Sequence, residues 1–162
     1  MSTLRDARPE DRALIERECV RHFGGAEITS RGAWFDARTL PAFVAERDSV
    51  VAGFLCHTPM ERGRECEVVA LVAIEPRSGV GGALLAEAVE RARRAGCSRV
   101  FLTTSNDNLD AMRFYQRRGW RLCAVYPGSL ERARAERPHL HEIGHHGIPI
   151  RDDVEFEVRL EE

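Results

Sequence analysis

Three closely spaced glycines, Gly79, Gly81 and Gly82, are the residues of this chain best suited to bind an anion. They follow an apolar run and precede a stretch of helical periodicity, so they form a turn between a strand and a helix. Glycine has no Cβ and adopts positive φ at little cost, so backbone N–H groups can approach a ligand closely. The first turn of the helix adds unpaired N–H groups and a positive dipole end. This glycine turn, Gly79–Gly82, predicts a binding site for the phosphates of a nucleotide.

Two common nucleotide-binding loops do not fit the glycine turn. A Walker-type loop requires a lysine directly after its last glycine, and Ala83 stands there. A dinucleotide fingerprint requires a third glycine where the chain has Leu84, and an acidic residue at the end of the next strand, which is Thr104. A different class of nucleotide ligand is therefore expected.

A second motif follows the next predicted strand. Its pattern N-x-x-A-x-x-[FL]-Y-x-x-x-G-[FW] is matched at every fixed position, by Asn108, Ala111, Phe114, Tyr115, Gly119 and Trp120. With the glycine turn, this stretch resembles the central motif of the GCN5-related N-acetyltransferase (GNAT) superfamily. The first half of that motif, V-x-P-x-x-[QR]-x-x-G-x-[GA], is matched in part. Leu71 stands at its valine, Ala73 at its proline and Pro76 at its Gln/Arg position, with Arg77 one place later.

The resemblance covers residues 42–126, and residues 144–158 are similar to the ending of uncharacterised bacterial members. It implies an α/β fold in a single acyl-CoA-dependent acetyltransferase domain over residues 1–162, with a mixed central sheet of about six to seven strands and helices on both faces. It also implies acetyl-CoA as the acyl donor. The implied donor contacts are Leu71, Val72, Ala73, Arg77, Gly79, Val80, Gly81, Gly82, Asn108 and Tyr115. Pro76 has neither a side-chain donor nor an N–H, so it cannot supply the pyrophosphate contact of the family residue.

Two glutamates upstream of the turn, Glu65 and Glu67, are the candidate general bases. Strand alternation places both on one face, and an ionised carboxylate beside an ammonium group can accept its proton directly or through water. The resemblance implies a base at either offset before Leu71. We prefer Glu67, because a charge nearer the strand centre is harder to explain structurally. The alternative for both is a solvent-facing carboxylate at the edge of a strand.

Tyr115 is the candidate acid. The resemblance implies that its hydroxyl points toward the coenzyme sulfur and protonates the departing thiolate. A phenol has a reference pKa of about 10 and a thiol one of about 8.5, so this transfer needs help from the surroundings. The alternative is a core tyrosine packed like Phe114. Asn108 is expected to cap the helix and to contact the pantetheine arm.

Substrate-binding residues are expected in two segments without a readable motif, 24–39 and 127–153. We select Trp34 from the first segment. From the second we select His146, which stands against the rigid Gly147–Pro149 turn. The histidines of this segment, His139, His141, His145 and His146, match no compact zinc pattern, so no metal site is predicted.

Periodicity, glycine and proline place the elements that carry these residues. Strands are expected at 3–7, 65–74, 99–104, 120–126 and 154–160, with a hairpin of 41–45 and 49–57 about 46–48. Helices are expected from 8 to 22, from 82 to 95, from 108 to 119, and briefly after 127. The apolar run in 65–74 suggests burial on both faces, and 24–39 fits either a helix or an extended segment.

Composition narrows the class of protein. A net charge of −2 gives no reason to expect a nucleic acid or a membrane as partner. Five scattered cysteines without a C-x-x-C pair indicate reduced thiols. The charged start of the chain lacks the apolar core of a secretion signal, so a cytoplasmic location is expected. The sequence leaves the oligomeric state open, although exposed last strands often pair in the fold that the resemblance implies, so a homodimer is one alternative.

The resemblance favours an N-acetyltransferase that moves an acetyl group from acetyl-CoA to a primary amine of a small molecule. One alternative is a catalytically silent CoA-binding sensor or partner protein, for which Pro76 is the best argument. Another is acetylation of a protein amine. An amine on a charged tRNA is disfavoured by the acidic net charge.

Overall fold

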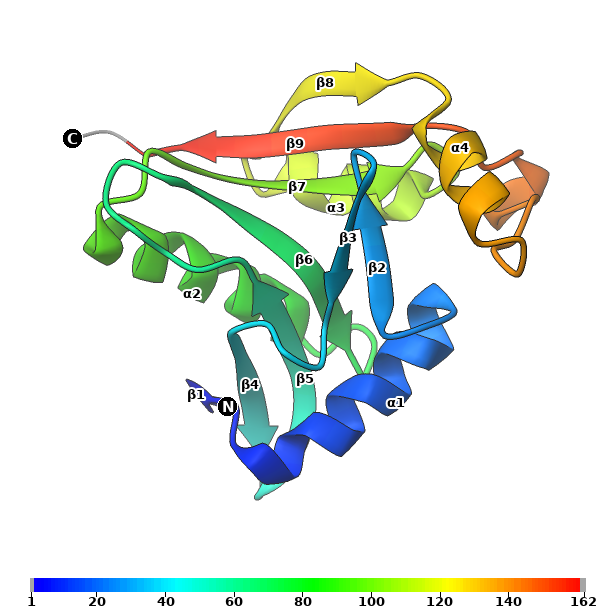
Figure 1. Cartoon of the computed structure of the whole chain (residues 1–162). Helices are drawn as coiled ribbons and strands as arrows, with labels where there is room; N and C mark the ends of the chain where they lie inside the picture. The colour runs from blue at the N-terminus through cyan, green and yellow to red at the C-terminus, as the bar shows by residue number, and fades with distance from the viewer. Residues whose placement is uncertain (1, 161–162) are drawn as a thin grey trace. The chain divides into compact units, whose positions relative to one another are not determined.

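The computed structural model describes residues 2–160 (Figure 1). The elements are, in chain order, β1 (Thr3–Asp6), α1 (Arg12–Phe23), β2 (Glu27–Ser30), β3 (Ala33–Asp36), β4 (Ala42–Arg47), β5 (Val50–His57), β6 (Glu65–Ala73), α2 (Val80–Ala95), β7 (Arg99–Ser105), α3 (Leu109–Arg117), β8 (Arg121–Tyr126), α4 (Ser129–Glu136) and β9 (Asp153–Arg159). Short 3₁₀ turns lie at Pro9–Asp11 and His145–Gly147. The seven-stranded sheet has the order β1-β4-β5-β6-β7-β9-β8, and β2 and β3 form a separate pair. The predicted α/β fold is confirmed.

The chain divides into two compact units, each described by itself below. Among the described residues, the first unit comprises 2–28, 35–100 and 159–160, and the second comprises 29–34 and 101–158. No helix within residues 2–160 combines the length and the apolar character needed to cross a membrane. All five cysteines are free thiols.

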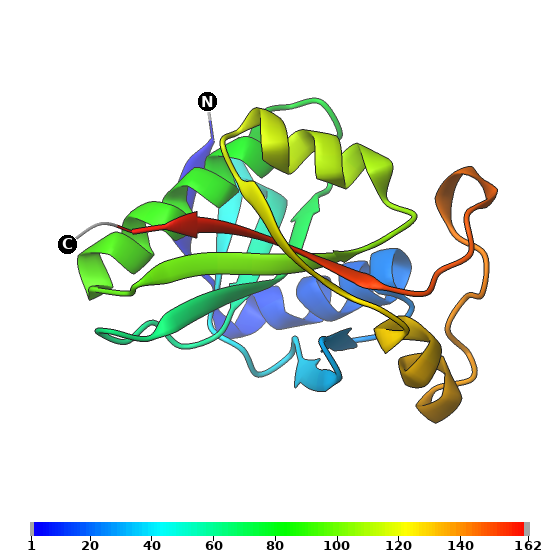
Figure 2. The same ribbon diagram turned by 90° about the horizontal axis from the view of Figure 1, so that it is seen from above.

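The first unit buries its core on the two faces of β4, β5 and β6, with α1 and α2 on opposite sides (Figures 1 and 2). Ile15 and Cys19 of α1 pack against Val44, Phe54 and Val72 of the three strands. All five are almost inaccessible to solvent. Successive side chains of a strand point to opposite faces, so the alternate residues of these strands form the face on which α2 packs. Burial also raises the pKa of the Cys19 thiol to about 12, so this cysteine acts as an apolar filler.

Gly53 shows how closely α2 approaches β5. A Cβ at this position would lie 2.6 Å from Cγ1 of Val80 and 2.7 Å from the Val72 carbonyl oxygen. We therefore expect Gly53→Ala to lower the free energy of unfolding by about 1–3 kcal/mol, the usual effect of overpacking a core. Chemical denaturation measures this change. Gly25→Ala is the control, because its added Cβ would meet nothing closer than 3.9 Å. Equal stability of the two variants would contradict the packing described.

Several predicted boundaries need correction. The β4–β5 turn lies at Asp48–Ser49 rather than 46–48, because both residues adopt the left-handed conformation of a two-residue hairpin, with φ of 52° and 63°. Helix α2 starts at Val80, two residues earlier than predicted, so Gly81 and Gly82 belong to its first turn. The run in β6 is not buried on both faces, since Val69 is only half-buried.

The ambiguous segment 24–39 is extended. It forms the hairpin of β2 and β3, whose turn residues Arg31 and Gly32 have φ of 52° and 83°. Gly24 ends α1 in the left-handed conformation with φ of 80°, and its N–H donates to the Val20 carbonyl. Gly24 therefore ends α1, and the residues that follow form a short two-stranded hairpin.

The second unit is built around the antiparallel pair β8 and β9, with α3 packed on β8. Tyr115 of α3 contacts the ring of Phe156 on β9, with ring centroids 5.8 Å apart. The register shifts between Leu122 and Ala124, so Cys123 is an extra, bulged residue on β8. Helix α4 follows β8 directly (Figure 1).

Candidate active site

The glycine turn forms the start of α2. Gly79 is the residue before the helix, with φ of 81°, and the first helical backbone bond runs from Ala83 N–H to the Gly79 carbonyl at 3.1 Å. Helix α2 has no side-chain cap and no acidic residue in its first turn. Helix geometry therefore leaves the N–H groups of Gly81 and Gly82 without intrahelical acceptors. This end of α2 fits an anion such as the pyrophosphate of a coenzyme.

Two arginines belong to the surroundings of this turn: Arg47 at the end of β4 and Arg77 two residues before Gly79. Arg47 donates to Glu75 and to the Ser78 carbonyl, each at 3.2 Å, and so ties β4 to the turn. Arg77 is exposed, has φ of 59°, and pairs with no acidic side chain of the described chain. Its guanidinium is therefore available to a phosphate, whereas Pro76 beside it has no donor to offer.

Strand β6, which leads into the turn, carries a bulge against β5. Cys56 pairs with Ala70 and His57 pairs with Val68, so Val69 is the extra residue. Leu71, Val72 and Ala73, the implied donor contacts that follow this bulge, pair in regular register with Leu55, Phe54 and Gly53 of β5. Bulges interrupt the ladder and redirect the strand, which is how backbone groups become available to a ligand.

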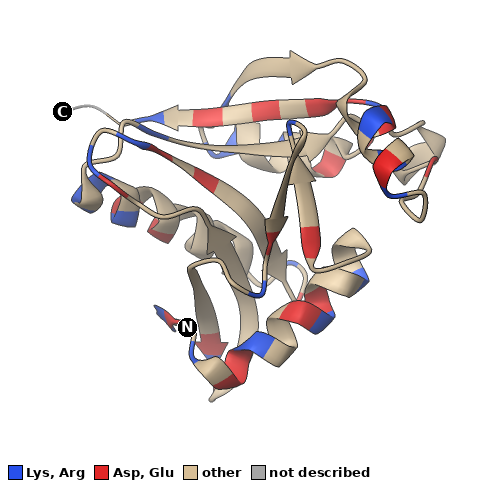
Figure 3. Ribbon diagram, in the orientation of Figure 1, with Lys and Arg blue, Asp and Glu red and all other residues tan. Residues whose placement is uncertain are grey.

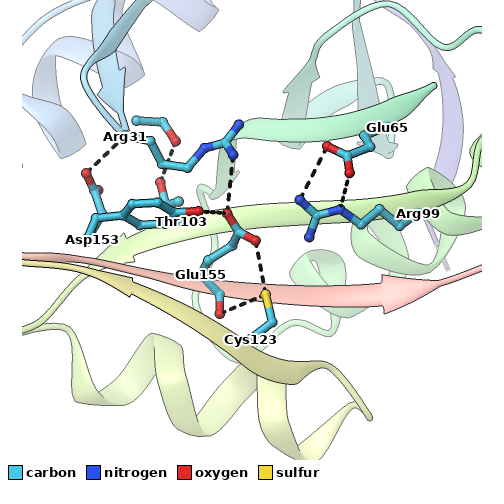
Figure 4. Close-up of polar contacts among 9 residues, drawn as sticks. Arg31, Glu65, Arg99, Thr103, Cys123, Asp153 and Glu155 are labelled. Carbon is cyan, nitrogen blue, oxygen red and sulfur yellow. Dashed lines mark hydrogen bonds and ion pairs between the residues drawn. The ribbon is translucent and has the colours of Figure 1, made fainter.

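Glu65 and Glu67 prove to be in different surroundings. Glu67 is only 3% exposed, and its N–H donates to the Thr58 hydroxyl at 2.9 Å. Glu65 has an exposed side chain that accepts two bonds from Arg99, at 2.8 and 3.3 Å (Figure 4). Glu65 thus has the solvent-facing, ion-paired position that sequence offered as the alternative, and Glu67 is the buried acid.

Tyr115 and Asn108 lie together on α3 of the second unit. The Asn108 side chain accepts from the Ala111 N–H at 3.2 Å, which confirms its predicted role as helix cap. The Tyr115 ring packs among Phe114, Trp120 and Phe156. Burial raises the pKa of the Tyr115 phenol to about 12. With this raised pKa the hydroxyl is protonated at neutral pH. It makes no hydrogen bond within the described residues, so it is available as a donor.

Trp34 and His146 occupy different places in the second unit. Trp34 lines a pocket of about 230 Å³ between the β2–β3 hairpin and α4, together with Arg31, Arg132 and Glu136. His146 is exposed, does not line this pocket, and has φ of 59° in the turn His145–Gly147. The two predicted substrate residues are therefore not brought to one pocket.

A buried polar cluster on β9 was missed by sequence reasoning. Asp153 and Glu155 are each 3% exposed (Figure 4). The Arg31 N–H donates to Asp153 at 3.1 Å, and its guanidinium lies 3.5 Å from Glu155. The hydroxyls of Ser129 and Tyr126 donate to Asp153 and Glu155, each at 2.9 Å. Loss of hydration on burial raises the pKa of Asp153.

The pattern that could have revealed this cluster is an alternation of acids along the last strand. Asp153, Glu155 and Glu157 alternate with apolar residues, and acidic positions recur along β9 in Figure 3. Alternation alone predicts a solvent-facing acidic side. The partners of the first two acids come from other segments: Arg31 from the β2–β3 hairpin, Tyr126 from β8 and Ser129 from α4. Within residues 2–160, no group of three or more His, Cys, Asp or Glu side chains could hold a metal ion.

Comparison with known proteins gives one family. The model of the acetyltransferase (GNAT) family matches residues 9–120. The chain is 36% identical over 138 residues to the uncharacterized protein YdhI of Bacillus subtilis, covering 85% of each protein. It is 29% identical over 147 residues to the uncharacterized protein YxbD of the same organism, covering 90% of each.

Solved structures share the fold. An IAA acetyltransferase from Bacillus cereus has a TM-score of 0.71 and 20% identity, covering 99% of this chain and 100% of that one. A GNAT family acetyltransferase from Elizabethkingia anophelis with acetyl-CoA bound has a TM-score of 0.70 and 16% identity, covering 98% of each. A Bacillus subtilis acetyltransferase in complex with CoA has a TM-score of 0.72 and 18% identity, covering 99% and 100%. At these identities the likeness concerns the fold, and it agrees with the match over residues 9–120: the chain belongs to the acetyltransferase (GNAT) family.

Proposed function

We propose that the protein transfers an acetyl group from acetyl-CoA to a primary amine of a small molecule, by direct attack within one catalytic domain. The observation that carries the proposal is a buried carboxylate, Glu67, on the strand that leads into an uncapped helix start. The first feature can remove a proton, and the second can bind a pyrophosphate. GNAT proteins of the same fold hold acetyl-CoA or CoA.

The donor is bound at the glycine turn. The N–H groups of Gly81 and Gly82 and the guanidinium of Arg77 supply positive charge for the pyrophosphate. Leu71, Val72 and Ala73, which follow the bulge, contact the pantetheine arm through their backbone. Val80, Asn108 and Tyr115 complete the donor contacts.

Glu67 acts as the general base. The acceptor arrives as an ammonium ion, and the carboxylate of Glu67 takes one proton directly or through water. The free amine attacks the thioester carbon, a C–N bond forms, and the C–S bond breaks to release a thiolate. The nitrogen loses its second proton as the amide forms, and this proton ends on the thiolate sulfur, so the products are the amide, the CoA thiol and a protonated Glu67 that returns its proton to water. Glu65 is held by Arg99 and has no part in this transfer.

Tyr115 assists the departure of the thiolate. Because burial raises its pKa to about 12, its phenol is a weaker acid than the thiol it would protonate. Its contribution is therefore a hydrogen bond that stabilises the developing negative charge on sulfur, and the proton released by the attacking nitrogen replaces the one that its hydroxyl passes to the thiolate. The raised pKa also keeps the phenol protonated over the whole neutral range.

We expect Tyr115→Phe to lower turnover by about 10- to 1000-fold, the scale of a lost general acid. Coenzyme affinity and the free energy of unfolding should change little, because the ring contacts remain. Steady-state kinetics and calorimetric titration with CoA measure the two effects. Phe114→Leu is a packing control that leaves the hydroxyl in place. Turnover of Tyr115→Phe near that of the wild type would reduce Tyr115 to a packing residue.

A thiol-release assay tests the proposed function. Acetyl-CoA and a panel of small primary amines, amino acids and peptides are incubated with the protein, and free CoA thiol is measured. Release that depends on a small amine supports the proposal. CoA binding without release from any acceptor identifies a silent sensor, and release with peptides alone identifies a protein acetyltransferase.

We also assign the reaction to the cytoplasm, where free cysteines such as those of this chain persist. A homodimer would form through β8, which ends the strand order and leaves Leu122 and Val125 each 51% exposed. No nucleic acid and no membrane takes part.

A further inference from the structure

The pocket between the β2–β3 hairpin and α4 has chemical features that no proposed donor contact uses. Its volume of about 230 Å³ lies below the range of about 300–1,000 Å³ for sites that hold drug-sized ligands. A ligand enclosed here is therefore small. All the lining residues belong to the second unit, so the pocket is defined within one compact body.

Arg132 supplies an unneutralised cation to this pocket. Its two terminal nitrogens contact only the Pro127 carbonyl oxygen, each at the long distance of 3.4 Å, and no carboxylate of the described chain pairs with it. Arg31, the other lining arginine, is engaged by Glu155 at 3.5 Å and stacks on the Phe101 ring at 4.4 Å. Arg132 is thus the arginine free to bind an anionic group, and guanidinium groups match carboxylates geometrically.

Thr29 adds a polar atom without a partner. Its Oγ1 is buried and makes no hydrogen bond, although Thr29 lines the pocket. An unsatisfied buried hydroxyl costs free energy, and most such groups in native structures have a partner. Other atoms of Thr29 line the pocket, so rotation of its side chain about χ1 would turn the hydroxyl toward a ligand oxygen or nitrogen there.

Trp34 and Glu136 also line the pocket. The indole N–H of Trp34 donates to Oε2 of Glu136 at 2.9 Å, and Arg137 lies over the indole ring at 4.7 Å. The second oxygen of Glu136 has no such donor. Arg132 and Glu136 stand one turn apart on α4, where Figure 3 shows both signs of charge, yet they do not pair with each other. The pocket therefore presents a separate cation and anion to its ligand.

We propose that this pocket binds the acceptor through a carboxylate group, with Arg132 as the anion-binding residue and the Thr29 hydroxyl as a second contact. The acceptors are then amino carboxylates of amino-acid size, and not simple alkyl or aryl amines. Glu136 favours the ammonium form of such a zwitterion at the pocket, and Trp34 packs against its carbon chain. The inference rests on the proposed function for the transfer step, and on the pocket alone for the binding step.

Matched pairs of acceptors test the inference. L-phenylalanine, L-tyrosine, L-leucine and L-lysine are each compared with the amine that lacks the carboxylate, namely phenethylamine, tyramine, isoamylamine and cadaverine. We expect kcat/KM to be about 10- to 100-fold higher for at least one amino acid than for its amine, the scale of one charge-assisted interaction. Arg132→Gln should bring that ratio close to one, mainly through KM, and Thr29→Val should lower it partially.

Arg21→Gln is the matched control, since Arg21 is an exposed arginine of α1 outside the pocket. It removes one positive charge and should leave the ratio unchanged. Equal rates for all pairs, or a preference that survives Arg132→Gln, would overturn the substrate class while leaving acetyl transfer to amines intact.

Direct titration separates this inference from the transfer step. The same amino acids and amines are titrated calorimetrically into the protein in the presence of CoA. If an amino acid binds to the wild type but not to Arg132→Gln, the pocket assignment is upheld. This holds even if no acceptor releases thiol, because the lack of thiol release would refute only the acetyl transfer. Absence of amino-acid binding together with absence of a carboxylate preference in the kinetics would refute the pocket assignment.

Discussion

Gly81→Val is expected to lower the affinity for CoA by about 100-fold or more, because one or two charge-assisted hydrogen bonds of about 1.5–3 kcal/mol each are lost. Gly81 lies in the first turn of α2, where its N–H has no intrahelical acceptor. A branched side chain there would stand beside the N–H groups that a pyrophosphate needs to approach. Isothermal titration with CoA measures the change.

The control for this variant is Ala86→Val, in the same helix. Ala86 is exposed, so Ala86→Val places the same β-branched residue in α2, with the same loss of helix stability, at a position outside the glycine turn. Circular dichroism and thermal unfolding should show that both variants remain folded. Unchanged CoA affinity for Gly81→Val would show that the donor does not bind at this end of α2.

Glu67→Gln is expected to lower turnover by about 10²- to 10⁴-fold, the contribution of a general base. The loss should be largest below the pKa of the amine and should shrink as pH rises, because free amine then forms without a base. CoA affinity should stay near that of the wild type, since glutamine preserves the shape of the buried side chain. A pH profile of kcat/KM for the variant and the wild type measures this difference.

Glu65→Gln is the matched control for the base. Glu65 lies on the same strand, but its carboxylate is exposed and bound to Arg99 at 2.8 Å. Its substitution should weaken only a surface ion pair, an interaction of about 0–1 kcal/mol, and leave turnover near wild type. A profile for Glu67→Gln that runs parallel to wild type with a modest drop, or a larger loss for Glu65→Gln, would exclude Glu67 as the base.

The features that the sequence predicted well depend on local interactions. The strand before Gly79, the helix after it and the cap at Asn108 follow from periodicity, positive φ and a side-chain bond to Ala111, only three residues away. The same stretch predicted the location of the glycine turn. Together with the complete motif match between Asn108 and Trp120, it also predicted the acetyltransferase (GNAT) family. Small errors, such as the start of α2, arose because the turn glycines are also acceptable in a first helical turn.

The features that only the tertiary structure decided depend on residues distant in sequence. Strand alternation predicts the same surroundings for Glu65 and Glu67. In the folded chain Arg99, thirty-four residues from Glu65, pairs with Glu65, whereas Glu67 is buried. Asp153 is buried, and its partners Arg31 and Ser129 lie 122 and 24 residues away in the sequence.

The pocket has the same origin. Arg132 and Thr29 are ordinary residues in their own segments, and neither lies in a motif. They become a candidate binding site because the β2–β3 hairpin lies against α4, which leaves the hydroxyl of Thr29 buried and Arg132 without a carboxylate partner. Burial and pairing are properties of contacts between distant segments, so periodicity and motifs along one chain do not contain them.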